Sequence, residues 1–203
     1  AGQLDKMNAQ LDKLTSLIAD LLDATKIESG KLQMNQEKFS FDELVTEIVE
    51  EIQRTTEKHV ITIKGKSNTN ITADRERTGQ VLTNLISNAI KYSPHSEKII
   101  IEPSVENKKF IMLCVKDFGV GIPKDKQNHV FERFYRVSGP KEITFPGLGL
   151  GLYISAEIVK RQGGRIWVES EEGIGSTFCF SLPLISHIEQ KASIDIEKEL
   201  IHS

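Results

Sequence analysis

Residues 4–28 carry apolar side chains at the spacing of a long helix. The apolar positions alternate steps of three and four residues, which is typical of the seam of a coiled coil or helical bundle: Leu4, Met7, Leu11, Leu14, Ile18 and Leu21. Leu17 and Leu22 widen the stripe, which favours a bundle of several helices over a two-stranded coil. Such a helix needs a neighbour, and no later segment resembles its hairpin mate. The alternative is that it folds back onto its own domain after ending at Gly30.

After this helix the pattern changes to short strands mixed with helices. The predicted strands cover 34–39, 60–63, 98–102, 109–115, 165–170 and 176–182. The last four of them form two hairpins. The predicted helices cover 40–52, 74–92 and 153–162. Ser40 and Asp74 supply N-caps for the first two helices. Residues 121–151 form a long mixed segment, and 185–203 are either a linker or a marginal helix.

The helix over 74–92 has a polar stripe opposite a broad apolar face. The apolar face consists of Val81, Leu82, Leu85, Ile86, Ala89 and Ile90. Asn84, Asn88 and Lys91 stand at i, i+4 and i+7 on the other face. Because asparagine lowers helix propensity, two of them on one face indicate a site. A neutral amide oxygen suits Mg²⁺ bound together with substrate phosphates, and the alternative is an ordinary polar surface stripe.

Three glycine-bearing segments follow this helix. In Asp117-Phe118-Gly119-Val120-Gly121-Ile122-Pro123, a carboxylate at a strand end can accept hydrogen bonds from an exocyclic amine, and the glycines let backbone approach a flat ligand. In Phe131-Glu132-Arg133-Phe134-Tyr135-Arg136, aromatic residues can anchor a loop while the arginines reach phosphate oxygens. Gly147-Leu148-Gly149-Leu150-Gly151-Leu152 opens a helix, and helix N-terminal amides form an anion site.

Composition sets limits on the function. With 38% hydrophobic residues, 27% charged residues and a net charge of −3, the chain resembles a soluble globular protein and has no electrostatic basis for binding nucleic acid or a polybasic membrane contact. Cys114 and Cys179 lie in apolar runs without metal-ligand spacing, so two buried thiols in a reducing compartment are expected and a disulfide is not. No apolar run reaches the roughly 20 residues that span a bilayer, and no signal-peptide pattern is present. A cytoplasmic location is expected, with any membrane contact made by segments outside this chain.

Each glycine segment alone is weak evidence. Gly-Leu-Gly-Leu-Gly lacks the dinucleotide-binding spacing, no Gly-Lys-Ser/Thr follows, and Asp-Phe-Gly stands without the catalytic loop and strand lysine of eukaryotic-type protein kinases. In order, however, the asparagine helix and the three segments resemble the N, G1, F and G2 boxes of the catalytic, ATP-binding domain of sensor histidine kinases. That domain belongs to a wider ATPase superfamily that includes gyrase, the mismatch-repair ATPase and the heat-shock chaperone. The resemblance covers 39–184, and residues 20–32 resemble the end of the second dimerisation helix of these kinases.

The resemblance implies the fold and the domain organisation. An α+β fold is expected, a two-layer α/β sandwich of the Bergerat type in which a mixed sheet is faced by three helices, preceded by a long bundle-forming helix. Residues 1–32 would be the second helix of a dimerisation and phosphoacceptor hairpin, 33–184 the catalytic ATP-binding domain, and 185–203 a tail or linker. ATP and Mg²⁺ are the implied cofactors.

The same resemblance assigns roles to single residues. Asn88 is expected to be the Mg²⁺ ligand, with Asn84 supporting the metal–phosphate arrangement and Lys91 contacting phosphate. Tyr92 is expected to pack on the nucleotide, and Asp117 to read adenine. The remaining predicted binding residues lie in the loops around these groups: Gly119, Gly121, Ile122, Arg133, Arg136, Gly147, Leu148, Gly149, Leu150, Gly151, Leu152 and Thr177.

Within that set the expected roles differ. Thr177 matches the hydroxyl that assists Asp117, and Arg133 and Arg136 are candidates to steady the γ-phosphate. The alternatives are that the aromatic residues Phe131 and Phe134 are simply core and that Arg136 is a solvated charge. Residues 124–146 are predicted to be a mobile lid, because turn signals outnumber regularly spaced apolar residues there.

The phosphoacceptor is the part of the family pattern that this sequence lacks. These kinases phosphorylate a histidine on the first dimerisation helix, followed by an acidic residue and a short proline-ending motif. None of the five histidines fits that pattern: His59, His95, His129, His187 and His202. The chain is therefore expected to be a fragment of a longer kinase that does not autophosphorylate alone.

The resemblance also implies a reaction and partners. The domain would transfer the ATP γ-phosphoryl group to a histidine of its own dimerisation domain, which forms a homodimer in the parent, for relay to a response regulator receiver domain. The alternatives are a nucleotide-gated interaction module without phosphoryl transfer and a superfamily ATPase that hydrolyses ATP to drive clamp closure. The heptad helix upstream, and the short tail where a clamp's transducer domain would lie, argue against the clamp.

Overall fold

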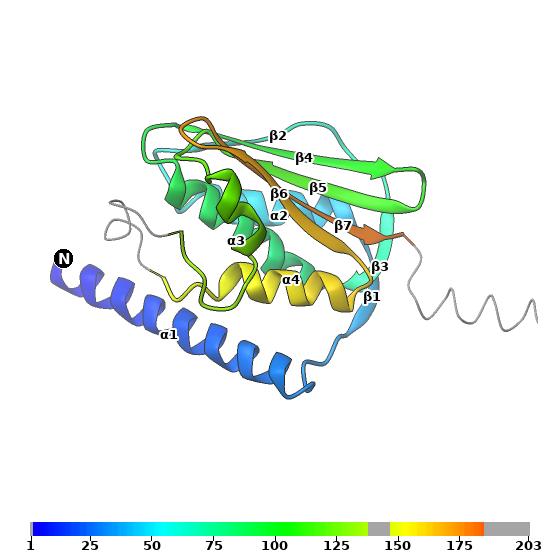
Figure 1. The fold of residues 1–203 in the computed structure, drawn as a ribbon, viewed down its shortest axis with the longest axis horizontal. Helices are drawn as coiled ribbons and strands as arrows, with labels where there is room; N and C mark the ends of the chain where they lie inside the picture. The colour runs from blue at the N-terminus through cyan, green and yellow to red at the C-terminus, as the bar shows by residue number, and fades with distance from the viewer. Residues whose placement is uncertain (1, 138–146, 185–203) are drawn as a thin grey trace, which may run out of the picture.

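The computed structural model describes residues 2–137 and 147–184, and Figure 1 shows two layers in this part of the chain. A five-stranded sheet forms one layer. The other layer consists of three helices on one face of the sheet: α2 (Phe41–Gln53), α3 (Arg75–Tyr92) and α4 (Gly151–Arg161). The long helix α1 (Gly2–Glu28) lies beyond α4. This arrangement confirms the predicted α+β fold, whereas the predicted tail over 185–203 lies outside the described residues.

The sheet has the strand order β2–β4–β5–β7–β6. Its strands are β2 (Val60–Ile63), β4 (Lys98–Glu106), β5 (Phe110–Lys116), β6 (Arg165–Glu171) and β7 (Gly175–Pro183). The strand β2 runs parallel to β4 and all other neighbours are antiparallel, so the sheet is mixed, as predicted. Both predicted hairpins are present. The central position of β5 explains its continuously apolar sequence.

A separate two-stranded sheet pairs β1 (Gln36–Ser40) with β3 (Asn70–Asp74). The strand β3 is not among the predicted strands, because it is short and offers only two alternating apolar positions before α3 begins. Asp74 ends β3 and caps α3 as predicted, since its side chain accepts a hydrogen bond from the Arg77 amide at 2.9 Å.

The hydrophobic core lies between the sheet and the helices. Alternate residues of β5 point toward the helices and are almost completely buried: Ile111, Leu113 and Val115. Phe180 of β7 contacts Phe41 of α2 edge to face, with ring centroids 6.4 Å apart. Leu85 and Ile86 of α3 are fully buried in the same core. The apolar face of α3 therefore fixes the rotation of this helix and turns its polar stripe toward α4.

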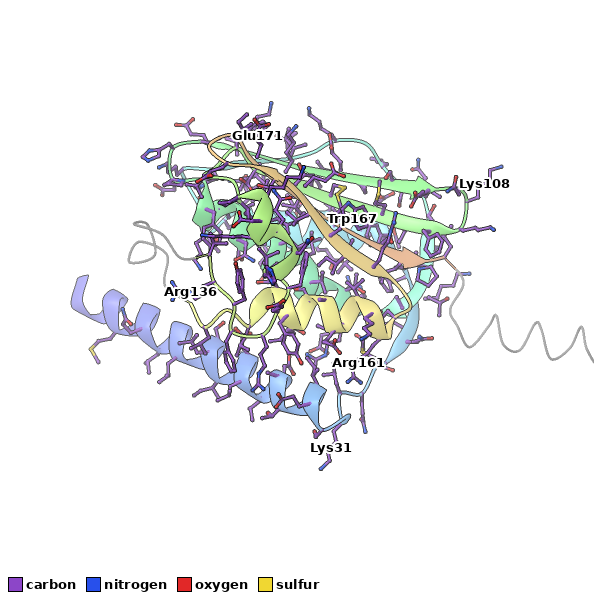
Figure 2. The ribbon with its side chains drawn as sticks, viewed as in Figure 1. Lys31, Lys108, Arg136, Arg161, Trp167 and Glu171 are labelled. Carbon is purple, nitrogen blue, oxygen red and sulfur yellow. A yellow bond between two sulfur atoms is a disulfide. The ribbon has the colours of Figure 1, made fainter. Side chains whose placement is uncertain are left out.

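Helix α1 contacts the rest of the molecule through its C-terminal end. Ala24 and Ile27 are buried there, and Asp23 pairs with Arg77 of α3 at 2.6 Å. Arg161, labelled in Figure 2, donates to the Ile27 carbonyl at 3.1 Å. The seam residues farther toward the N-terminus are 48–58% exposed: Met7, Leu11, Leu14, Ile18, Leu21 and Leu22. The helix thus docks at one end on its own domain, while the described part of its seam stays uncovered.

No helix within residues 2–137 and 147–184 is long and apolar enough to cross a membrane.

The expectation of two free thiols is wrong. Cys114 of β5 and Cys179 of β7 stand directly opposite each other in the antiparallel register, with their Cα atoms 4.1 Å apart, and form a disulfide. The register brings together two residues that are 65 positions apart, which sequence spacing does not reveal. Because Leu113 and Val115 point toward the helices, the bridge lies on the opposite face of the sheet.

Candidate nucleotide-binding site

The polar stripe of α3 faces the start of α4. Asn84 Nδ2 donates to Ser155 Oγ of α4 at 2.8 Å, and Asn88 Nδ2 donates to Asn84 Oδ1 at 3.4 Å. A Cβ atom on Gly151 would lie 2.4 Å from Asn84 Oδ1, so a side chain larger than glycine would clash there. Asn84 therefore links two helices. In the described part of the chain, the Asn88 side chain makes this hydrogen bond through Nδ2 and accepts none through Oδ1.

Lys91 lies where the glycine-rich loop begins. Its Nζ atom is 4.7 Å from the ring centroid of Tyr92, and a Cβ atom on Gly147 would lie 3.2 Å from this nitrogen. Lys91 and Tyr92 are both partly buried at the end of α3. The ammonium group is therefore a positive charge beside the backbone of the loop, where it favours an anion.

The loop itself ends in a helix N-terminus. Leu150 is 1% exposed and anchors the loop in the core, whereas Leu148 is 42% exposed and Leu152 packs at the edge of the core. Among residues 2–137 and 147–184, no side chain caps the N-terminal amides of α4, which begins at Gly151. Such amides carry a partial positive charge, to which the nearby Lys91 adds. The loop and Lys91 form a positively charged corner, the candidate anion-binding corner of the site.

The segment over residues 131–137 lies against this loop. Phe134 donates its amide hydrogen to the Gly149 carbonyl at 3.0 Å. A Cβ atom on Gly149, whose φ is +70°, would lie 2.7 Å from the Tyr135 carbonyl oxygen. Phe131 packs edge to face on Phe178 at 6.3 Å between ring centroids, whereas Phe134 is 52% exposed. Of the two aromatic residues considered as core, only Phe131 packs there.

The two arginines of this segment have different surroundings. Arg133 pairs with Glu28 of α1, and its guanidinium lies 4.5 Å from the ring centroid of Phe134. Arg136, labelled in Figure 2, lies close to the loop, since its Cγ atom would be 3.2 Å from a Cβ atom on Gly149. Arg136 thus stands beside the candidate anion-binding corner, while α1 holds Arg133.

Asp117 supplies a buried acceptor at the end of β5. It is 4% exposed, and its Oδ1 atom accepts hydrogen bonds from the amides of Gly119 at 2.9 Å and Ser176 at 3.2 Å. Burial raises the pKa of Asp117, and these two amides and the Ser93 hydroxyl oppose the rise because they stabilise the charged form. The carboxylate is therefore oriented by the backbone through one of its oxygens.

The glycines after Asp117 allow close backbone contacts on both sides. A Cβ atom on Gly119 would lie 2.1 Å from the Tyr92 carbonyl oxygen, and one on Gly121 would lie 2.0 Å from the carbonyl oxygen of Glu171, which Figure 2 labels at the tip of β6. Ile122 donates its amide hydrogen to Ser170 Oγ at 2.8 Å. The loop is thus held between the end of α3 and the β6–β7 hairpin.

The structure places Thr177 away from the Asp117 carboxylate. Thr177 pairs with Lys116, and this pair lies on the face of the sheet opposite the helices. Ser176, one position earlier, lies on the helix-facing side and contacts Asp117 through its amide. Thr177 was expected to supply a hydroxyl that assists Asp117. In the structure it is the hydroxyl of Ser93 that stabilises the charged form of Asp117 and lowers its pKa.

Sequence reasoning did not identify Ser93 as a residue of the site, nor the buried contact of His59 with it. Ser93 is completely buried directly after Tyr92, where a serine before a proline is ordinarily a helix-end residue. His59 is 5% exposed, and its Nε2 lies 3.1 Å from the Ser93 carbonyl oxygen. The motif Lys91-Tyr92-Ser93-Pro94 places Ser93 directly after two predicted site residues, which was a signal that it lies near the site. No local pattern connects Ser93 with His59.

The chemistry of the site fits a nucleotide with a hard cation. Within the described residues no group of three or more His, Cys, Asp or Glu side chains could hold a metal ion by itself. The Oδ1 atom of Asn88 is the one predicted metal ligand, and it lies one helical turn from Lys91. A cation held by a single neutral oxygen needs other oxygen ligands, which phosphate groups supply.

Comparisons with known proteins show the family of the chain. Residues 73–186 match the family described as histidine kinase-, DNA gyrase B-, and HSP90-like ATPase. The chain is 37% identical over 177 residues to the sensor histidine kinase WalK of Bacillus subtilis, covering 86% of this chain and 29% of WalK. It is 33% identical over 183 residues to the adaptive-response sensory kinase SasA of Synechococcus elongatus, covering 89% of this chain and 47% of SasA.

A solved structure shows the same arrangement of elements. The histidine kinase AdeS of Acinetobacter baumannii superposes with a TM-score of 0.68 and 26% identity, covering 89% of this chain and 83% of that one. The chain spans less than half the length of WalK and SasA. The matched family covers the buried carboxylate, the asparagine helix and the glycine-rich loop together. The chain therefore belongs to the family of histidine kinase-, DNA gyrase B- and HSP90-like ATPases.

Proposed function

We propose that this chain is the ATP-binding catalytic part of a sensor histidine kinase. In this proposal it transfers the γ-phosphoryl group of ATP to a histidine on a dimerisation helix outside this chain, and a response regulator receives the group next. The observation that carries the proposal is the meeting of Asn88, Lys91 and the uncapped start of α4 at one corner, with the buried Asp117 beyond Tyr92. The similarity to WalK and SasA supports a kinase over a clamp-type ATPase.

Different residues of the chain would bind different parts of the nucleotide. Asp117 would accept a hydrogen bond from the exocyclic amine of adenine, because it is a buried acceptor already oriented by two backbone amides. Tyr92 would pack on the nucleotide. The amides at the start of α4 and Lys91 would bind the phosphate chain, with the glycine loop close to the phosphates because it carries no bulky side chains at Gly147, Gly149 and Gly151.

Phosphoryl transfer asks the protein mainly for positioning and charge neutralisation. Asn88 Oδ1 would hold Mg²⁺ together with phosphate oxygens, and the ion would supply positive charge where negative charge develops. Arg136 lies beside the same corner and is the arginine best placed to steady the γ-phosphate. Arg133 would join it after leaving Glu28.

The uncovered seam of α1 supports a dimerisation partner. Its exposed apolar residues repeat at bundle spacing, and such a stripe is stabilised by burial against other helices. We propose that the other helix of the hairpin and a second copy of the kinase cover this stripe. The acceptor histidine would then lie on a neighbouring helix, within reach of the nucleotide.

Labelling with radioactive ATP tests the proposal. The chain alone is expected to remain unlabelled, while a separately supplied dimerisation hairpin of the parent kinase gains acid-labile label. Transfer between separate pieces should be slow, because tethering normally supplies a large effective concentration. Asn88→Ala should abolish transfer.

Two outcomes would contradict it. Strong acid-labile label on the isolated chain, lost on substitution of one of its five histidines, would show that the acceptor lies within this chain. Rapid ATP hydrolysis without transfer to the hairpin would favour the superfamily ATPase instead.

A further inference from the structure

The hydroxyl group of Ser93 is buried at the end of α3, close enough to Asp117 to lower the pKa of that carboxyl. Ser93 is 0% exposed, and within the described residues its Oγ atom makes no hydrogen bond by geometric criteria. Its backbone is the C-terminal cap of α3, with φ −113° and ψ 56°. Buried polar atoms in native proteins are nearly always hydrogen-bonded, so such an atom beside a binding site points to a partner outside the protein or to a change on binding.

The hydroxyl lies next to the loop that carries the buried carboxylate. A Cβ atom on Gly119 would lie 2.8 Å from Ser93 Oγ, which places this oxygen directly over the Gly119 backbone. The Oδ1 atom of Asp117 accepts both backbone amides, and in the described part of the chain no hydrogen bond uses Oδ2. The Ser93 hydroxyl also lowers the pKa of Asp117.

Hydrogen bonds from the connection between α2 and β2 hold the backbone of Ser93 in place. Its carbonyl oxygen can only accept, so His59 Nε2, 3.1 Å away, carries a hydrogen and donates it. In the neutral ring, Nδ1 of His59 then accepts from the Thr56 hydroxyl at 3.3 Å. Lys58 donates to the carbonyl of Pro94, the next residue. The connection between α2 and β2 therefore holds the Ser93 backbone and limits where its hydroxyl can move.

We propose that Ser93 is a positioning residue for base recognition, which orients the free oxygen of Asp117 toward the exocyclic amine of a 6-aminopurine. When the base is bound, the Ser93 hydroxyl donates to Oδ2 of Asp117, and the remaining lone pair of Oδ2 accepts from the amine. A carboxylate oriented in this way favours a 6-amino over a 6-oxo purine. The amine donates a hydrogen bond to Oδ2, whereas the oxo group is itself an acceptor and cannot. This inference rests on the proposed role of Asp117.

The test compares nucleotides that differ at one position of the base. ATP and inosine triphosphate share the sugar and phosphates but carry an amino and an oxo group at position 6. Dissociation constants of both are measured for the wild type, Ser93→Ala, Ser93→Cys and the matched control Ser87→Ala, whose serine is exposed on α3. Ser93→Ala should weaken ATP by about tenfold and leave inosine triphosphate unchanged, since a hydrogen bond to a charged group is lost. Ser93→Cys should lie between the two, and Ser87→Ala should match the wild type.

A pH profile separates this role from a purely structural one. Without the Ser93 hydroxyl the pKa of Asp117 should rise further, so ATP binding by Ser93→Ala should be lost at a higher pH than in the wild type. An unchanged ratio of ATP to inosine triphosphate affinity, an equal loss of both nucleotides, or an unshifted pH profile would each overturn the inference.

Asp117→Ala distinguishes failure of this inference from failure of the proposed site. If Asp117→Ala loses ATP while Ser93→Ala keeps the wild-type preference, the inference about Ser93 alone is wrong. If Asp117→Ala binds ATP like the wild type, the assignment of the adenine pocket itself is wrong, and the inference about Ser93 falls with it. Should Ser93→Ala fail to fold, Ser93→Cys carries the comparison, because it keeps the volume and a weak donor.

Discussion

The two ends of the candidate site, named the base end and the phosphate end after their proposed roles, are built differently. At the base end, Asp117 is almost fully buried, and two backbone amides from neighbouring segments hold it. At the phosphate end, Asn88 and Lys91 are only partly buried, and Arg133 pairs with a residue of α1. The contacts that hold Asp117 therefore come from the sheet and the loop that follows β5. The phosphate end, in contrast, includes the segment over residues 131–137, which also contacts α1 through Arg133. This difference predicts that base recognition is set by the fold and phosphate contacts by the position of α1.

The largest expected effect follows from removing the carboxylate at the base end. Asp117→Ala should weaken both ATP and ADP by about 100-fold, because a charge-assisted hydrogen bond to the amine is lost whatever the number of phosphates. Titration with a fluorescent nucleotide, with and without Mg²⁺, measures it. Wild-type affinity for ADP in this variant would contradict the assignment of the base end.

The second effect belongs to the phosphate end. Asn88→Ala should weaken ATP by about tenfold when Mg²⁺ is present and by little when a chelator removes it, because only a metal ligand is lost. Ser87→Ala, on the exposed side of the same helix, is the control. An equal loss with and without the cation would show that Asn88 acts on the nucleotide directly.

The same division decides what could be predicted from the sequence. Asn84, Asn88 and Lys91 were recognisable because helical period places them on one face without any knowledge of the fold. The Asp117 loop was recognisable because a carboxylate and two glycines follow a continuously apolar strand. Local signals therefore sufficed for residues whose grouping depends on one element.

What the sequence could not reveal depends on pairing between distant elements. The Cys114–Cys179 bridge is a consequence of β5–β7 register, and the contact of Arg133 with Glu28 depends on where α1 docks. Thr177 matches the family motif, but only strand alternation in the folded sheet shows that its side chain lies on the face opposite the helices. The position of Ser93 depends on a hydrogen bond with His59, which lies in the connection between α2 and β2.

The third prediction concerns the acidity of the base end. Burial raises the pKa of Asp117 above 3.8, so its charged form is lost at a higher pH than for an exposed aspartate. As the pH falls through this raised pKa, the affinity for ATP should decline, since the protonated carboxyl is a poorer acceptor. Asp117→Asn should bind weakly with a flatter profile, and subtracting that profile removes the titration of ATP itself. Parallel profiles for the two proteins would contradict the prediction.

A smaller effect is expected where α1 holds Arg133. Glu28→Gln should tighten ATP by about threefold and leave ADP unchanged, because a partly exposed ion pair contributes little and its release frees the arginine for the γ-phosphate. Calorimetric titration with the two nucleotides isolates the terminal phosphate. Glu50→Gln, which breaks the exposed pair with Arg54 on α2, is the matched control. If Glu28→Gln tightened ADP as well, α1 would act on the base end too, and the two ends would not be independent.

The smallest effect on binding is expected from the disulfide, although it joins the strands that carry the base end. Cys114 precedes Asp117 by three positions, and Cys179 follows Ser176 by three, yet the bridge lies on the opposite face of the sheet from the pocket. The Cys114→Ala/Cys179→Ala double variant should lower the free energy of unfolding by about 2–4 kcal/mol, because its unfolded chain is less constrained. The affinity for ATP should change by less than about twofold, since the strand ladder and the amides of Gly119 and Ser176 still orient Asp117. Thermal unfolding with and without a reductant measures the first quantity, and the double variant should be insensitive to the reductant. A loss of ATP affinity on reduction that matches the loss in Asp117→Ala would show that the bridge, and not the fold alone, sets the geometry of the base end.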